Sequence, residues 1–181
     1  MKTRFTPDEF MLMLTELSAR LHKSGRFVEF VLFGGGALSL YYGSREQTKD
    51  LDVAFQAELT DQIGELVRTI GHQFHADSDW LNRKGAFFLT QSMQDEALDF
   101  LSLPGLRVKV LRPEALLALK IASARIFTDT PDLDDLRFLL HHLEIRDVDA
   151  ALAIAREQLP ELRTGLQAAS VVALEAALRD E

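Results

Sequence analysis

The sequence predicts a mixed α/β fold whose C-terminal part is entirely helical, and three observations support this expectation. Short apolar runs rich in β-branched and aromatic residues alternate with helical patterns as far as residue 111. Beyond Pro113, further helical patterns follow with little strand signal. The composition, 47% hydrophobic and 27% charged over 181 residues, is that of a folded globular chain. We therefore expect an α/β core over residues 1–111, with a mixed sheet of about four to five strands and flanking helices. Residues 112–181 are expected to form a helical part packed on this core.

The overall charge of the chain is acidic. It has 20 Lys and Arg against 28 Asp and Glu, a formal net charge of −8, which argues against broad nonspecific binding of nucleic acid. The absence of cysteine excludes a disulfide scaffold, a thiolate zinc site and a cysteine nucleophile. The apolar runs are too short to span a membrane, and the N-terminal residues lack the apolar segment of a signal peptide. We therefore expect a soluble, cytoplasmic protein with no membrane partner.

The first predicted helix begins at Pro7. Thr6 is the expected N-cap, proline is favoured at the first helical position, and Glu9 completes a capping box. The apolar residues that follow at helical spacing are Phe10, Leu14, Leu17 and Leu21. Ser24-Gly25 then provides a stop signal, so this helix ends there.

The remaining elements follow from the same two periodicities. Residues 27–33 are too apolar and too β-rich for a surface element, so an inner strand is expected there. Other strands are predicted over residues 49–55, 87–89, 97–103 and 106–111, the last two turning at Pro104-Gly105. Helices are predicted over residues 37–42, 59–71, 116–127, 133–143, 148–159 and 162–178.

Two aspartates, Asp50 and Asp52, lie two positions apart in the predicted strand 49–55. Such side chains leave the same face of a strand, with Cα atoms about 6.5 Å apart. Carboxylates at that separation repel each other unless a cation lies between them. Oxygen ligands of this kind suit Mg²⁺ or Mn²⁺, which completes its shell with water and phosphate oxygens. Leu51 and Val53 alternate with the aspartates, as expected if the opposite face belongs to the core.

Three glycines, Gly34, Gly35 and Gly36, end the predicted inner strand and precede a short predicted helix. Glycines expose backbone N–H groups without an obstructing Cβ, and a helix N-terminus adds partial positive charge, so a triphosphate can bind there. A phosphate-binding loop followed by a metal-binding strand is the arrangement that nucleotidyl transfer requires. Taken singly, each motif has a common structural explanation: a tight turn for the glycines and a solvated surface pair for the aspartates.

The glycine loop followed by the Asp-x-Asp strand resembles the nucleotidyltransferase superfamily that includes DNA polymerase β. More closely, the chain is similar to a bacterial group of small nucleotidyltransferases related to the AbiEii toxins of abortive-infection toxin–antitoxin systems. The residues that carry this resemblance are Gly34-Gly35, Tyr42-Gly43, Arg45, Thr48 and Asp50-Leu51-Asp52, with segments 79–82, 116–125 and 132–136. The resemblance covers residues 28–143. It implies a nucleotidyltransferase fold, a nucleoside triphosphate (NTP) substrate and a divalent cation.

Three further residues are candidates for contact with a nucleotide. Arg45 and Thr48 lie in the predicted loop before the metal-binding strand, where a guanidinium could clamp a phosphate, although both could equally be solvated. We assign them to nucleotide binding together with the three glycines. Trp80, the only tryptophan, could stack on a base, but packing of a large aromatic side chain is the commoner outcome.

The resemblance also implies a third carboxylate on a later strand, serving as metal ligand or as base for the incoming hydroxyl. The best candidate is Asp99, which lies between apolar neighbours in the predicted strand 97–103. A charge in that position requires a cation or a solvated edge. The alternative is an edge-strand charge that discourages aggregation. Without Asp99 in place, the site could bind a nucleotide and turn it over poorly or not at all.

Lys120 lies within the apolar arc of the predicted helix 116–127. At 100° per residue, with Leu116 at 0°, Lys120 falls at about 40°, among apolar side chains. It must reach solvent or meet an anion, because burying it unpaired is costly. A nucleotide phosphate or a site carboxylate would satisfy it, and so would a structural ion pair with Asp132 or Asp135. We expect Lys120 to be a catalytic electrostatic clamp and Asp135 to contribute to nucleotide binding, since Asp132 is explained by its place in the first turn of a helix.

Together these features predict Mg²⁺-dependent transfer of a nucleoside monophosphate from an NTP to an acceptor hydroxyl. The acceptor classes are RNA such as tRNA, a protein side chain and a small molecule. The resemblance further implies a toxin whose partner is an antitoxin protein. Two alternatives stay open: a non-catalytic nucleotide-binding or regulatory module, and a protein-interaction component that uses the helices beyond Val148 to bind a partner or to form a homodimer.

Overall fold

The computed structural model describes residues 2–56, 61–123, 130–160 and 168–179. The chain forms two compact units, of which the first comprises Met1–Leu89 and Ala97–Leu111 and the second comprises Thr90–Glu96 and Arg112–Glu181. Residues 90–96 therefore belong to the helical unit, whereas the sequence pattern assigns them to the α/β part. Arg112 Nε donates a hydrogen bond of 3.1 Å to the carbonyl of Glu96, so the two segments that lead into the second unit are tied to each other.

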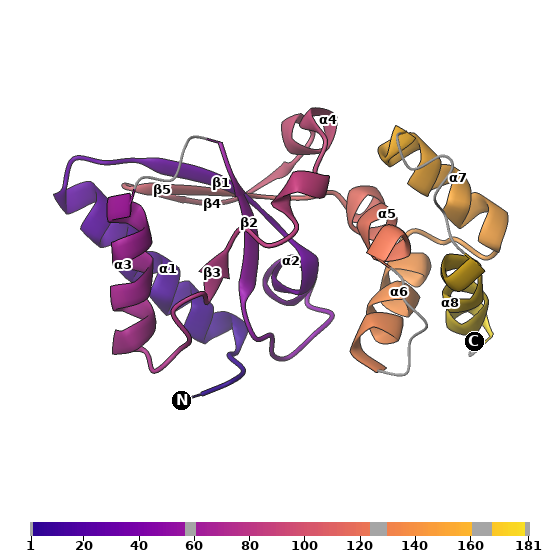
Figure 1. The fold of residues 1–181 in the computed structure, drawn as a ribbon, viewed down its shortest axis with the longest axis horizontal. Coiled ribbons are helices and arrows are strands. Elements are labelled where there is room, and N and C mark those ends of the chain that lie inside the picture. Colours follow the sequence, from indigo (N-terminus) through magenta and orange to yellow (C-terminus); the bar gives the residue numbers. More distant parts are fainter. Residues whose placement is uncertain (1, 57–60, 124–129, 161–167, 180–181) are drawn as a thin grey trace. The chain divides into compact units, whose positions relative to one another are not determined.

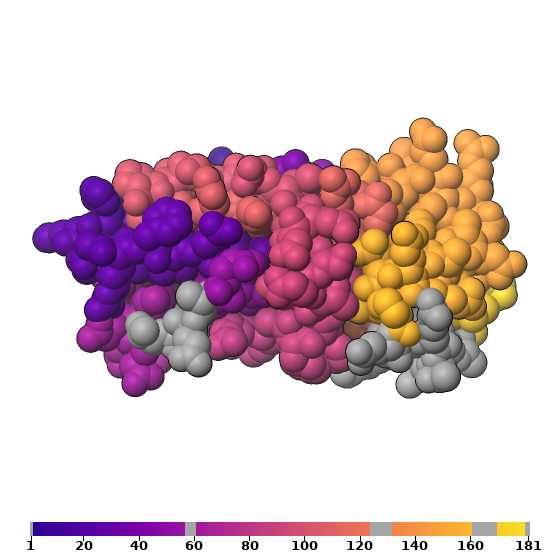
Figure 2. Space-filling model, turned by 90° about the horizontal axis from the view of Figure 1, so that it is seen from above, coloured from indigo at the N-terminus to yellow at the C-terminus, as the bar shows by residue number. Residues whose placement is uncertain are grey.

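The first unit is built on a five-stranded mixed sheet in the order β3-β2-β1-β5-β4 (Figure 1). The strands are β1 (Val28–Phe33), β2 (Leu51–Phe55), β3 (Leu81–Asn82), β4 (Leu98–Leu103) and β5 (Leu106–Val110). β1 runs antiparallel to β2 and parallel to β5, β2 runs parallel to β3, and β4 runs antiparallel to β5. In Figure 2 the salmon surface that includes β4 and β5 lies beside the indigo N-terminal surface that includes β1. The predicted α/β class with a mixed sheet is confirmed.

The centre of the sheet is β1, as its apolar sequence predicts. Phe30, Val31 and Leu32 are fully buried because a strand with neighbours on both edges and packed faces exposes no side chain. The predicted hairpin 97–111 is present as β4 and β5. The strand predicted over residues 49–55 is present as β2, although it begins two residues later.

Helices α1 (Pro7–Lys23) and α3 (Asp61–Gln73) contact each other and lie on one side of the sheet (Figure 1). The predicted capping box at Thr6 is present, with the Glu9 N–H donating to the threonine hydroxyl and the Glu9 carboxylate accepting from the Thr6 N–H. Trp80 is buried, stacks on Phe10 and donates its indole N–H to the carbonyl of Val67 at 2.8 Å. Its role is therefore packing, as the commoner explanation predicted.

Two elements of the first unit differ from the prediction. The prediction of a strand over residues 87–89 is wrong. Instead, η1 (Ala86–Phe88) is a 3₁₀ turn closed by a hydrogen bond from the Phe88 N–H to the Gly85 carbonyl. Phe87 and Phe88 give this segment a strand-like composition, but their side chains are exposed. The helix predicted over residues 37–42 begins at the first glycine instead, as α2 (Gly34–Leu40). The two-residue strand β3 gives too short a pattern to be predicted.

The described part of the second unit is helical. Its helices are α4 (Gln91–Asp95), α5 (Pro113–Ser123), α6 (Thr130–His142), α7 (Val148–Gln158) and α8 (Ala168–Leu178). The four helices predicted beyond Pro113 are present, and their predicted residues 124–127 and 162–167, like 59–60 in the first unit, lie outside the described residues. α5 contacts α6, α7 and α8, and Ala151, Leu152 and Ala155 of α7 are buried. None of the described helices combines the length and hydropathy needed to cross a bilayer.

Candidate metal- and nucleotide-binding site

The two aspartates of the Asp-x-Asp motif lie at the start of β2. Asp52 is the second residue of the strand, and Asp50 directly precedes it. Leu51 and Val53, which alternate with them, are fully buried. Because side chains alternate along a strand, Asp50 and Asp52 share the opposite face, and both are partly exposed. This is the arrangement that the sequence pattern predicted for a cation-binding pair.

The glycine segment contacts this pair directly. Phe33, the last residue of β1, is in register with Asp52, so the chain turns into α2 immediately beside the carboxylate. Gly34 has a φ of +62°, and a Cβ on it would lie 3.0 Å from Asp52 Oδ2. The left-handed backbone favours glycine, and the close approach to the carboxylate adds to this preference. The first N–H groups of α2, which by helix geometry have no partner within the helix, begin at this point.

The other two glycines have different neighbours. A Cβ on Gly35 would lie 3.2 Å from Thr48 Oγ1 and 3.3 Å from an Nη atom of Arg45, so both predicted nucleotide-binding side chains lie over this glycine. A Cβ on Gly36 would lie 2.8 Å from Leu51 Cδ2. Gly36 is thus explained by packing of α2 against the core side of β2, whereas Gly34 and Gly35 face the polar groups.

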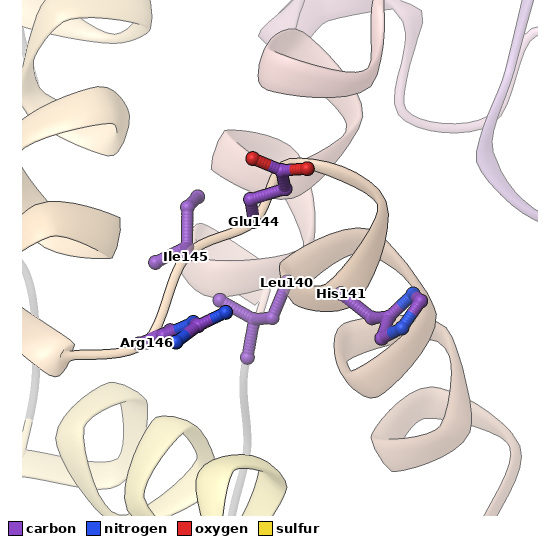
Figure 3. Close-up of a pocket in the computed structure, with 5 residues that line it drawn as sticks. All are labelled: Leu140, His141, Glu144, Ile145 and Arg146. Carbon is purple, nitrogen blue, oxygen red and sulfur yellow. The ribbon is translucent and has the colours of Figure 1, made fainter.

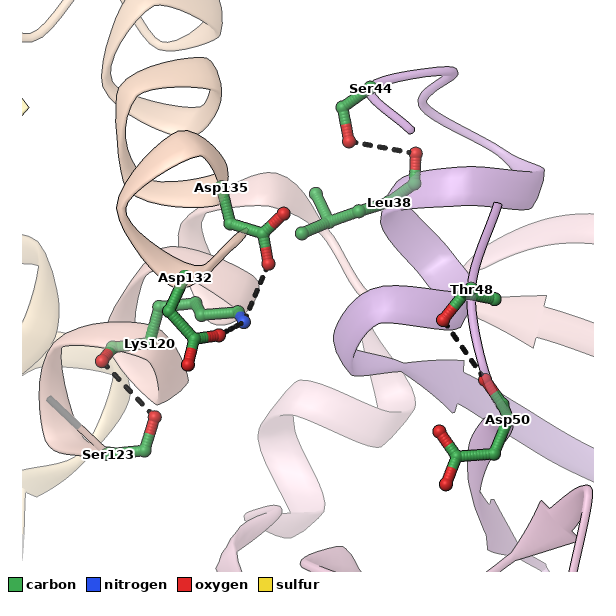
Figure 4. Close-up of polar contacts among 8 residues, drawn as sticks. All are labelled: Leu38, Ser44, Thr48, Asp50, Lys120, Ser123, Asp132 and Asp135. Atoms are coloured by element: carbon green, nitrogen blue, oxygen red, sulfur yellow. Dashed lines mark hydrogen bonds and ion pairs between the residues drawn. The ribbon is translucent and has the colours of Figure 1, made fainter. Parts of the chain in front are cut away.

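Thr48 links the loop to the first aspartate. It is buried, its backbone exchanges two hydrogen bonds with Phe5, and its hydroxyl lies 3.5 Å from the carbonyl oxygen of Asp50 (Figure 4). Arg45 is held through its backbone, since its carbonyl accepts from the Ser39 hydroxyl at 3.1 Å. The structure therefore brings Gly34, Gly35, Arg45 and Thr48 into one cluster with the two aspartates.

Two residues of this cluster, Asn82 and Lys84, are not among the predicted site residues. Asn82 of β3 is in register with Asp52, and its Nδ2 lies 3.4 Å from Asp50 Oδ2. Its Oδ1 accepts from the Lys84 N–H at 2.7 Å, and Lys84 Nζ forms an ion pair of 2.5 Å with Asp79. In the sequence, Asn82 is indicated only by its place in segment 79–82 of the family resemblance. No sequence pattern indicates Lys84.

Two pKa values in the cluster, those of Asp50 and Lys84, are raised for different reasons. Burial raises the pKa of the Asp50 carboxyl, against the attraction of Lys84 and Lys49. The hydrogen bond and charge of Asp79 raise the pKa of Lys84, which is also attracted by Asp50 and Asp52. Burial thus disfavours the charged form of Asp50, and a bound cation would reverse this preference.

Asp99, the predicted third carboxylate, does not join the pair. It lies on the exposed edge strand β4, opposite Lys109 of β5. Strands β1 and β5 separate β4 from β2, a lateral distance of about 14 Å at the usual strand spacing. A ligand to a cation held by Asp50 and Asp52 must approach within about 2.1 Å of it. The structure therefore favours the alternative of an edge-strand charge.

The side chains of Asp50 and Asp52 supply some, but not all, of the ligands that a hard cation requires. The two carboxylates are oxygen ligands that Mg²⁺ or Mn²⁺ accepts, and water or phosphate oxygens would supply the rest of an octahedral shell. Within the described residues, no cluster of three or more His, Cys, Asp or Glu side chains is arranged to hold a metal ion. Binding of the cation would therefore depend on oxygens that the substrate brings.

Lys120 and its two predicted partners lie in the second unit. Lys120 Nζ is 2.6 Å from Asp132 Oδ1 and 2.6 Å from Asp135 Oδ2 (Figure 4). The side chain of Asp135 is only 1% exposed, whereas that of Asp132 is 51% exposed. Of the two explanations left open by the sequence, this geometry matches the ion pair within the helical unit.

The second unit also contains a cavity of about 570 Å³ (Figure 3). It is lined by Leu140, His141, Glu144, Ile145 and Arg146, around the end of α6 and the turn into α7. These residues are not among those predicted to bind a nucleotide.

Comparisons of the chain with protein-family models, with curated proteins and with solved structures found no match. The functional argument therefore depends on the geometry of the residues themselves and on the motif resemblance.

Proposed function

We propose that the protein is a nucleotidyltransferase that uses Mg²⁺ or Mn²⁺ to transfer a nucleoside monophosphate from an NTP to an acceptor hydroxyl. The observation that carries the proposal is the contact between the two halves of the motif. Gly34 adopts a left-handed conformation, and a Cβ on it would lie 3.0 Å from the carboxylate oxygen Oδ2 of Asp52, which is a tight contact. A phosphate placed on the glycine backbone would thus lie beside the pair of carboxylates.

In this proposal Asp50 and Asp52 hold the cation, and Asn82 orients Asp50. When bound, the cation would neutralise phosphate charge and polarise the reacting phosphorus. The backbone of Gly34 and Gly35 and the guanidinium of Arg45 bind phosphate oxygens, since charge-assisted hydrogen bonds to a phosphate are among the strongest available to a protein. Catalysis by such a site consists mainly of positioning and charge stabilisation. The proposal leaves out Asp99 and Lys120 because the first lies several strands away and the second already has two carboxylate partners.

The acceptor is a hydroxyl of RNA such as tRNA, of a protein side chain or of a small molecule. The similarity of the motifs to the AbiEii-type group supports a toxin whose activity a cognate antitoxin protein restrains. The net charge of −8 disfavours a large nucleic-acid footprint, since backbone binding needs clustered cations.

A second candidate function is a nucleotide-binding module without catalysis. The observation that favours it is the position of Asp99 on β4, which β1 and β5 separate from the aspartate pair on β2. Such a site would bind a cation and an NTP but would lack a third carboxylate to act as ligand or base. A homodimer or partner contact through the helices beyond Val148 is less favoured, because α7 and α8 already pack within their own unit.

Both candidates are tested by one pair of measurements. Isothermal titration with each NTP and Mg²⁺ would compare the wild-type protein with Asp50→Ala, Asp52→Ala and the control Asp99→Ala, an exposed carboxylate of the same sheet. Incubation of radiolabelled NTPs with cellular RNA and protein would then identify the acceptor. Loss of binding in the first two variants alone, with labelled product, supports the transferase. Metal-dependent binding without product supports the module, and absence of binding by the wild type rejects both.

A further inference from the structure

Two exposed phenylalanines lie beside the candidate site, on the 3₁₀ turn η1. Phe87 is 81% exposed and Phe88 is 52% exposed, and their ring centroids are 4.0 Å apart. Large aromatic side chains contribute more stability when buried, as Phe10, Phe30 and Phe33 are in the same unit. An adjacent pair of exposed rings is therefore a feature that folding of this unit does not explain.

The position of η1 is set by Gly85, which packs against the end of β1. A Cβ on Gly85 would lie 3.5 Å from the ring of Phe33, and its φ of +79° again requires glycine. Phe33 is in register with Asp52, and residues in register on neighbouring strands project from the same face of a sheet. Gly85, which leads into the turn with Phe87 and Phe88, therefore lies on the face of the sheet that carries the two aspartates, and η1 contacts β2, the strand of Asp52.

The segment between the aspartates and the two rings is cationic. Lys84 follows Asn82 by two residues, is paired with Asp79 and is attracted more weakly by Asp50 and Asp52, and Gly85 then leads into η1. The segment thus presents an amide against a carboxylate, then an ammonium group, then two aromatic rings. An NTP has its metal-bound phosphates at one end and its base at the other, so the groups of this segment follow the same order as the parts of an NTP that they would contact.

We infer that Phe87 and Phe88 form a platform on which the nucleobase of the NTP stacks, an inference that rests on the proposed function. Aromatic side chains bind bases through the π-face that every base has, so this contact confers affinity with little selectivity. Purines offer the larger face, and ATP and GTP should bind more tightly than CTP and UTP. The rings serve the base, whereas the phosphates are bound at the aspartates and the glycine backbone.

The test measures binding of the full-length protein by isothermal titration with Mg²⁺ and either ATP or inorganic tripolyphosphate, which lacks the base and ribose. The variants are Phe87→Ala, Phe88→Ala and Phe87→Trp, with Phe27→Ala as the matched control. Phe27 is also exposed, at 58%, but it precedes β1, whereas the site lies at the other end of that strand. Circular dichroism would check that each variant is folded, which we expect because the replaced side chains are already in solvent.

We expect each alanine variant to weaken ATP binding about 5- to 100-fold while tripolyphosphate binding stays unchanged. Phe87→Trp should retain or improve ATP binding, and Phe27→Ala should match the wild type. Equal affinity of the alanine variants and the wild type for ATP would overturn the inference while leaving the transferase proposal intact. A wild-type protein that binds neither ATP nor tripolyphosphate would instead reject the proposed function itself, and the inference with it.

Discussion

Replacement of Lys120 by methionine tests whether its ammonium is a structural ion pair or a phosphate clamp. Methionine keeps most of the aliphatic length but removes the charge that faces Asp135, whose side chain is 1% exposed. Removal of one partner of a buried ion pair costs about 3–5 kcal/mol. Asp132 is half exposed, so its contact with Lys120 contributes at most about 1 kcal/mol. We therefore expect Lys120→Met to lower the stability of the helical unit by several times as much as Asp132→Asn.

The assay is urea unfolding followed by far-UV circular dichroism, for Lys120→Met, Asp132→Asn and the double variant Lys120→Met/Asp135→Leu. The single lysine variant could fail to fold, since a loss of about 3–5 kcal/mol is a large part of the usual stability of a domain. The double variant removes both buried charges and should recover most of the loss, because an apolar pair of similar volume replaces a buried ion pair at little cost.

Two results would refute this reasoning. Lys120→Met could be no less stable than Asp132→Asn, which would mean that Asp135 gains nothing from the lysine. Alternatively, Lys120→Met could keep its stability but lose affinity for Mg²⁺·ATP, which would assign the ammonium to the nucleotide. The same titration of the double variant separates these cases, since a purely structural pair leaves nucleotide binding intact once the fold is restored.

Two further predictions concern the Asp-x-Asp cluster. Gly34→Ala should lower the free energy of unfolding by more than the roughly 1–2 kcal/mol of a left-handed alanine, because its Cβ would also lie 3.0 Å from Asp52 Oδ2. Gly25→Ala is the control, since Gly25 has a similar φ of +68° with open space around it and should show only the backbone cost in urea unfolding. Equal losses of stability in the two variants would contradict the effect of the Asp52 contact. Asp50→Asn should stabilise the metal-free protein at neutral pH, because burial raises the pKa of Asp50 and the stabilising protonated form is lost as the pH rises through that raised value. Thermal unfolding with a chelator should show the gain vanish below the unfolded pKa of about 3.9, and a gain that persists in acid would contradict this cause.

Much of the fold follows from local patterns. The first helix is set by the capping box at Thr6, and the inner strand by seven consecutive residues with few polar side chains. The hairpin of β4 and β5 is set by its Pro104-Gly105 turn. The segment 87–89 shows the limit of such patterns, because two phenylalanines indicate a strand whatever surrounds them. Their exposure depends on Gly85 and on the ring of Phe33, which is remote in sequence.

The candidate site was predictable where its residues are close in the chain. Gly34, Gly35, Arg45, Thr48 and the two aspartates fall within 19 residues, and the structure brings them together. The sequence pattern correctly predicts a strand at Asp99 but cannot tell whether this strand lies beside the aspartate pair, because strand order depends on long-range pairing that local patterns do not encode. The sequence pattern does not reveal Asn82 for the same reason, since Asn82 joins the site through its register with Asp52 on the neighbouring strand.

The path of the chain between the two units has a consequence for how they can be separated. The backbone leaves the sheet after Leu89, returns at Ala97 and leaves again after Leu111, and the Arg112–Glu96 hydrogen bond joins the outgoing and returning stretches. The chain therefore passes between the units three times, and a protease that cuts at one of these crossings releases neither unit intact. Truncation after Leu111 would likewise leave α4 attached to a sheet to which it does not belong, so a clean α/β fragment requires residues 90–96 to be replaced by a short linker.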